Sequence, residues 1–202
     1  RWDSQFVDET NPSKNLFLNP NRFSETAGAA REFLMDEERS RELVTRVGFG
    51  FVQNVSRHFP DPASDQTESQ TTNEGGFEWQ TDALWAWANG RLLYRGQLLV
   101  FVPVAFSEAD ALKEFDEIAI AADPGREQIQ DFWKVPTVNF QNTFDAKVTE
   151  WLALNLFVQL IYEKFDRTTV IDPAAPEVVD AGIRKAGQFK QTLAVSLTYR
   201  FR

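Results

Sequence analysis

His58 is the only histidine of this 202-residue chain, so any catalytic scheme that needs an imidazole depends on it. Ser56 lies two residues earlier, and on a β-strand residues i and i+2 share a face. A histidine beside a serine could activate the hydroxyl for attack on an ester. Such pairs are common by chance, and no G-x-S-x-G or H-E-x-x-H motif accompanies this one. We therefore expect no enzymatic activity, and keep a lipid hydrolase that uses His58 as an alternative.

Charge and composition exclude several other functions. The net charge is −9 and the basic residues are scattered, which argues against binding of nucleic acid. The chain has no cysteine for disulfides or zinc-thiolate sites, and we expect no metal and no cofactor. It has no run of about 18 apolar residues that would predict a transmembrane helix, and no visible signal peptide. Eighteen Phe and six Trp favour β-structure.

Six segments from residue 43 onward alternate apolar and polar residues, which is the period of a strand with two different faces. Their approximate limits are 43–59, 77–88, 91–106, 138–148, 151–165 and 192–202. Asn89 and Gly90 lie between the second and third segments. This pair predicts a type I′ hairpin turn, because both central residues of such a turn need a positive φ. The sequence therefore predicts an all-β, antiparallel fold.

Residues 1–42 fit the alternation less well. Residues 1–7 read as a short strand, and 11–23 are irregular with two prolines. Residues 24–41 predict a helix, on the spacing of Ala27, Ala30, Phe33 and Leu34, although a strand competes with it there. Six strands do not comfortably close a membrane barrel, so either this region adds strands or the chain is part of a longer barrel or assembly. We treat residues 1–202 as one domain.

The predicted connections alternate between short and long. The long ones run over about 60–76, 107–137 and 166–188, and the second should contain a helix that begins after Ser107. In an up-and-down barrel, this alternation puts every long loop on one rim. Outer-membrane barrels have short periplasmic turns and long external loops, so the alternation is typical of that class.

The last predicted strand carries the clearest alternation. Leu193, Val195, Leu197, Tyr199 and Phe201 are separated by small or polar residues, with Arg200 among them. This strand resembles the C-terminal insertion signal of Gram-negative outer-membrane β-barrel proteins, although here Arg202 follows the aromatic residue on which the family usually ends. The resemblance implies an outer-membrane location and an antiparallel up-and-down transmembrane barrel of about eight or more strands. It also implies contact with membrane lipid and with outer-membrane or periplasmic proteins, and it implies no substrate.

Two sets of side chains follow from the alternation. Aromatic rings near the strand ends predict belts at the headgroup level of a bilayer. The predicted lipid-facing belt residues are Trp79, Trp85, Trp87, Phe106, Trp151, Tyr162, Tyr199 and Phe201. The predicted lumen-facing polar residues are Arg46, His58, Glu78, Asp82, Arg91, Arg95, Asp145, Lys147, Glu163 and Arg200. Their mixed signs fit either a lumen sealed by ion pairs or a small pore.

The function that these patterns favour is a non-enzymatic outer-membrane barrel that acts as a small pore or as a scaffold for a partner. The main alternative is a soluble β-barrel that holds an apolar ligand inside. The same alternation serves both, because the inside and the outside of a barrel exchange when every strand is turned over.

Overall fold

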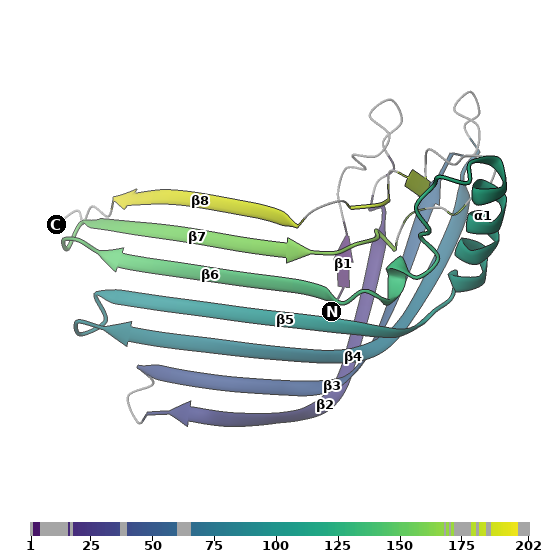
Figure 1. The fold of residues 1–202 in the computed structure, drawn as a ribbon. Helices are drawn as coiled ribbons and strands as arrows, with labels where there is room; N and C mark the ends of the chain where they lie inside the picture. The colour runs from purple at the N-terminus through teal and green to yellow at the C-terminus, as the bar shows by residue number, and fades with distance from the viewer. Residues whose placement is uncertain are drawn as a thin grey trace.

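The computed structural model describes residues 2–4, 16, 18–36, 40–59, 66–167, 169, 171, 179–180, 182–184 and 187–197. They form one antiparallel sheet in which every strand pairs with the next strand along the chain (Figure 1). Its strands are β1 (Trp2–Ser4), β2 (Asn21–Met35), β3 (Arg41–His58), β4 (Glu68–Trp87), β5 (Leu92–Phe106), β6 (Thr137–Lys147), β7 (Leu152–Tyr162) and β8 (Gln188–Leu197). One α-helix, α1 (Ala109–Ala122), and one short 3-10 helix, η1 (Phe132–Lys134), lie between β5 and β6.

The predicted all-β, antiparallel, up-and-down architecture is confirmed. Within the described residues the sheet is open, because no pairing joins β8 to β1 or β2. None of the described helices is long and apolar enough to cross a membrane.

The helix predicted over residues 24–41 is wrong, because most of this segment belongs to β2. β2 pairs with β3 along nearly its whole length, from Asn21 opposite Val55 to Met35 opposite Glu42. Helix propensity is a weak preference that pairing of this extent overrides. Asp36 then turns the chain, since its carboxylate accepts hydrogen bonds from the backbone N–H groups of Ser40 and Arg41.

The loop predicted over 60–76 is also too long. Residues 68–76 continue β4, and they pair with β3 as far as His58 opposite Glu68. The helix after Ser107 is confirmed, but Ser107 does not cap it. Its hydroxyl instead accepts a hydrogen bond from the backbone N–H of Asn73, at the end of the β4–β5 pairing.

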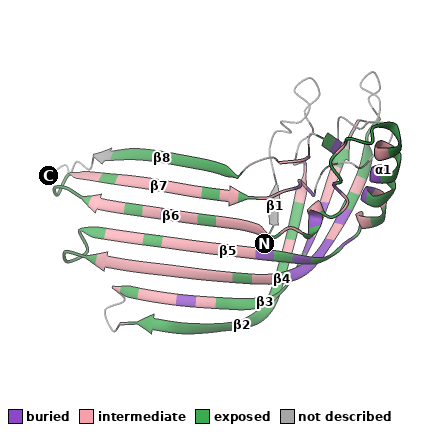
Figure 2. Cartoon of the chain, viewed as in Figure 1, coloured by how far each residue is buried: buried purple, intermediate pink, exposed green. Residues whose placement is uncertain are grey.

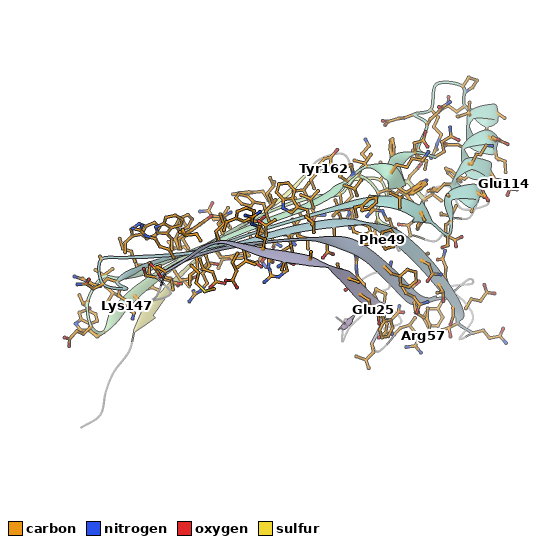
Figure 3. All side chains as sticks on the ribbon, turned by 90° about the horizontal axis from the view of Figure 1, so that it is seen from below. Glu25, Phe49, Arg57, Glu114, Lys147 and Tyr162 are labelled. Atoms are coloured by element: carbon orange, nitrogen blue, oxygen red, sulfur yellow. The ribbon has the colours of Figure 1, made fainter. Side chains whose placement is uncertain are left out.

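Short connections lie at one rim of the sheet and long connections at the other (Figure 1). The short rim carries the β2–β3, β4–β5 and β6–β7 turns. In the β4–β5 turn Asn89 and Gly90 have φ values of 55° and 77°, as predicted, and Ala88 also has a positive φ of 51°. The last strand pair is Trp87 opposite Leu92, so the connection is longer than the predicted two-residue turn. In Figure 3, Lys147 marks the short rim and Glu114 of α1 marks the opposite end of the molecule.

The buried hydrophobic cluster lies at the long rim. It consists of Phe106, Leu112, Phe115, Ile129, Trp133, Phe165 and Val179. Figure 2 shows buried residues gathering toward the end of the sheet that carries α1. We call residues 107–136 and the described residues of 163–184 the cap. Asp116 fixes its interior, since one carboxylate oxygen accepts hydrogen bonds from the N–H groups of Ile129 and Gln130, both at 2.7 Å.

Candidate functional site

The pairing register sorts the strand residues onto two faces, because residues directly opposite each other point to the same side. One row runs through Val47, Trp79, Val100, Val138 and Tyr162, and it defines the apolar face. The row through Asp82, Gln97, Gln141 and Gln159 defines the polar face. The apolar face carries mainly aromatic and aliphatic side chains, whereas the polar face mixes charged and amide side chains with apolar ones such as Leu99, Phe101 and Phe157.

The apolar face is exposed over most of its extent. Its exposed large side chains are Val47, Phe49, Phe51, Phe77, Trp79, Trp87, Leu92, Val102, Phe140, Phe144, Leu154, Leu160, Tyr162, Phe189, Leu193 and Val195. They come from β3 to β8. At β2 the same face carries Phe23, Glu25, Ala27, Ala29, Arg31 and Leu34, so charged and small residues interrupt the apolar surface there. Large exposed apolar surfaces are typical of membrane contact, of protein–protein interfaces and of ligand-binding surfaces.

Polar side chains on the apolar face bond to each other. The Tyr94 hydroxyl donates to Oδ1 of Asn142 at 2.7 Å, and Asn142 is only 8% exposed. The Tyr94 ring lies over Gly96, where an added Cβ would come within 2.4 Å of the Tyr94 hydroxyl oxygen. The hydroxyl oxygens of Thr45 and Thr81 are 3.0 Å apart. These groups therefore have hydrogen-bond partners within the protein.

Asp82 is the centre of one network on the polar face. Its carboxylate forms an ion pair with Arg46 and accepts hydrogen bonds from Gln80 and Gln97. The four side chains come from three neighbouring strands. The network therefore ties β3, β4 and β5 together in the middle of the sheet.

Asp145 is the centre of a second network on the same face. Arg95 lies 2.7 Å from one of its oxygens, and the amide of Asn155 donates to the other at 2.6 Å. Positive and negative side chains thus alternate from strand to strand and neutralise each other. This arrangement satisfies the charges laterally and contains no nucleophile paired with a base.

Some of the predicted belt residues lie on the apolar face and others do not. Trp79, Trp85, Trp87 and Tyr162 lie on the apolar face, and Trp151 lies in the turn before β7 with 58% of its surface exposed. The prediction for Phe106 is wrong, because it lies on the polar side, 7% exposed and 5.9 Å from Trp133 between ring centroids. A register shift beside Gly75 and Gly76 leaves Val104 unpaired and reverses the alternation beyond it. Tyr199 and Phe201 lie outside the described residues.

The predicted lumen-facing residues are also divided. The register places Arg46, Glu78, Asp82, Arg95, Asp145 and Lys147 on the polar face. Arg91 lies instead in the β4–β5 turn, just before β5 begins. Its guanidinium donates to the carbonyls of Lys147 and Val148 across the short rim. Glu163 belongs to the cap, just beyond β7. His58 is the last residue of β3, and its side chain, like Arg200, lies outside what the structure describes.

Arg167 joins the cap to the polar face and was not predicted. It is 3% exposed, and its guanidinium donates to the carbonyls of Trp133 and Val135, both at 3.1 Å, and to the Thr137 hydroxyl at 2.9 Å. Its own carbonyl accepts a hydrogen bond from Thr72 on β4 at 3.2 Å. One residue thus connects β4, η1 and the start of β6.

Two carboxylates lie beside the same guanidinium. Oε2 of Glu74 is 3.4 Å from Nε of Arg167, and Oε1 of Glu163 is 3.5 Å from Nη1. Glu74 is 1% exposed, and neither of its oxygens has a hydrogen-bond partner among the described residues. Burial raises the pKa of the Glu74 carboxyl above its usual range, and burial followed by the charge of Asp166 raises the pKa of Glu163. Sequence alternation missed both Glu74 and Arg167, because each lay in a predicted loop.

In the described part of the chain, no cluster of three or more His, Cys, Asp or Glu side chains could hold a metal ion. The chain matches no protein-family model, no curated protein and no solved structure.

Proposed function

We propose that this sheet is the wall of an outer-membrane β-barrel, with its apolar face against lipid and its polar face toward the lumen. The barrel serves as a non-enzymatic scaffold that displays the cap at the outer mouth. One observation carries the proposal. The chain packs its own segments over the polar face, through Arg167 on Thr72 and Glu74, and leaves the apolar face bare.

Strand lengths support a membrane span. β6 and β7 have 11 residues each and β8 has 10, whereas a tilted transmembrane strand needs about 9–11. β3 and β4 are longer, with 18 and 20 residues, and the cap contacts the extra length of β4 at Thr72 and Glu74. The spanning part of β4 is residues 77–87, with Phe77 at one end and Trp87 at the other.

The environment that the apolar face requires favours a membrane barrel over a soluble barrel that holds an apolar ligand. Full burial of one large apolar side chain is worth about 1.5–3 kcal/mol, so leaving this whole face in water is strongly unfavourable. A soluble barrel around an apolar ligand would turn this face inward. The cap would then lie on the outside of that barrel, where it would shield a polar surface that water solvates well.

A scaffold fits the polar face better than an open pore does. The charges of Asp82 and Asp145 are neutralised by Arg46 and Arg95, and the cap covers the polar face at the long rim. Both features restrict passage through a lumen. The partner of the scaffold would meet the cap, which is the part of the chain that projects from the spanning strands.

Quenching by brominated lipid tests the proposal. Single-tryptophan variants that keep Trp79 or Trp133 would be reconstituted in vesicles whose phosphatidylcholine carries bromine on its acyl chains. Trp79 should be strongly quenched, since it lies exposed on the apolar face, and Trp133 should be quenched little, since it is buried in the cap. A protein that remains monodisperse in water without detergent, with Trp79 unquenched by the vesicles, would refute the membrane assignment.

A further inference from the structure

The cap is held over the sheet by a charge cluster whose composition is unusual for a buried site. The described acidic members are Glu74 of β4 and Glu163 and Asp166 of the cap. The basic members are Arg22 of β2, Arg167 and Arg184. Arg184 forms ion pairs with Glu163 at 3.5 Å and with Asp166 at 2.9 Å. Among the described members of this cluster, Arg167 alone forms an ion pair with Glu74.

Glu74 is the buried carboxylate of this cluster whose negative charge has the fewest stabilising contacts. Ionised carboxylates in protein interiors are stable when hydrogen-bond donors surround them, and otherwise they tend to take up a proton. Both oxygens of Glu74 lack such a donor among the described residues, and the nearest guanidinium nitrogen is 3.4 Å away. Arg167 keeps Glu163 and three neutral acceptors whether or not Glu74 is charged. A proton on Glu74 thus removes a desolvated charge without removing the attachments of Arg167.

We propose that Arg167 and Glu74 form a proton-dependent latch, which holds the cap closed on the polar face when Glu74 is protonated and loosens it when Glu74 is ionised. The idea that the latch covers a lumen rests on the proposed function. The opening of the cap does not depend on it. Opening gives Glu74 access to water, where the carboxylate is solvated. The closed cap therefore binds more protons than the open one.

The direction with pH follows from this difference. The pKa of Glu74 in the closed cap is raised above its ordinary value of 4.5. Between the ordinary and the raised value, the closed state holds a proton that the open state has lost, so the free energy of opening falls as pH rises. Below the ordinary value both states are protonated, and no further closure is gained. The cap should open toward neutral pH and close toward acid.

Cysteine labelling on the full-length chain, which has no native cysteine, measures this opening. Thr72→Cys places a thiol under the cap, where the native side chain is 2% exposed and contacts the Arg167 carbonyl. Thr71→Cys is the matched control, because it is the preceding residue on the opposite, exposed side of β4. The rate of reaction with a water-soluble maleimide at position 72, divided by that at position 71, cancels the pH dependence of the thiol.

This ratio should rise severalfold from pH 5 to pH 8, because the free energy of opening falls as Glu74 loses its proton. Glu74→Gln in the Thr72→Cys chain should flatten the profile and keep the ratio low, whereas Arg167→Met should raise it at every pH. Glu78→Gln, on the same face of β4 but not among the residues that contact Arg167, should leave the profile unchanged. A ratio that is flat or falls with rising pH in the parent, or a profile that Glu74→Gln does not alter, would overturn the latch. Lipid quenching at Trp79 is read separately, so failure of either proposal leaves the other measurable.

Discussion

Gly96 should be essential on the apolar face because the ring of Tyr94 occupies the space above it. Replacement by alanine would put a Cβ 2.4 Å from the Tyr94 hydroxyl oxygen and 2.8 Å from Cζ, so the ring must move. The Tyr94–Asn142 hydrogen bond would then break, which leaves a buried amide unsatisfied at a cost of about 1–3 kcal/mol. The ring would also lose its contact with Phe144, whose centroid is 5.0 Å away, worth about 0.5–1.5 kcal/mol.

Gly96→Ala should therefore lower the free energy of unfolding by about 1.5–4.5 kcal/mol. The assay is reversible denaturant unfolding in lipid vesicles, followed by tryptophan fluorescence. A double-mutant cycle isolates the cause, since the effect of Gly96→Ala should largely disappear in a Tyr94→Ala background. Gly125→Ala is the control, because an added Cβ there meets one atom at 3.4 Å and should change stability little. Two results would refute this reasoning. One is a Gly96→Ala protein as stable as the parent, and the other is an equal loss of stability when Tyr94 is alanine.

Three further predictions test the orientation of the sheet. Leu156→Arg, on the apolar face of β7, should lower the free energy of unfolding in vesicles by about 2–4 kcal/mol, while Thr192→Arg on the polar face of β8 should be tolerated. If Thr192→Arg is the more destabilising change, the polar face is the one that meets lipid. Protease added to intact cells should cut within residues 60–67, a segment of polar sequence between β3 and β4, and cleavage at Asn89–Gly90 instead would reverse the orientation. Deletion of residues 199–202 should abolish outer-membrane assembly, as the resemblance to the insertion signal implies, and Phe201→Ala should slow it; a water-soluble, folded deletion product would favour the soluble barrel.

The strands that the sequence predicted best are those with two contrasting faces. β6 and β7 lie within three residues of their predicted limits, because Val138, Phe140 and Phe144 alternate with polar residues and a tight turn separates the two strands. The face of each residue then follows from its position alone. Local pattern is sufficient where the two faces of a strand carry different kinds of side chain.

β2 and the first half of β4 were missed because neither shows that contrast. Around Gly28 both faces of β2 carry small or charged residues, and residues 68–74 of β4 are polar on both sides. Pairing with β3 forms both segments, and that pairing is long-range. The attachments of Arg167 were missed for a related reason, since Thr72 lies 95 residues away and Trp133 lies 34 residues away in sequence.

The error at Phe106 shows how one strand serves two environments. Up to Val102, β5 follows the alternation of a sheet whose apolar side chains are exposed on one face. The register shift beside Gly75 and Gly76 then reverses the alternation, and Phe106 enters the buried cluster with Leu112 and Phe115. Without the shift, Phe106 would point away from the cap and leave a cavity beside Trp133. The register shift in the β4–β5 pairing therefore marks the boundary between the proposed spanning wall and the cap. It is also where the alternation of β5 predicts the wrong face for Phe106.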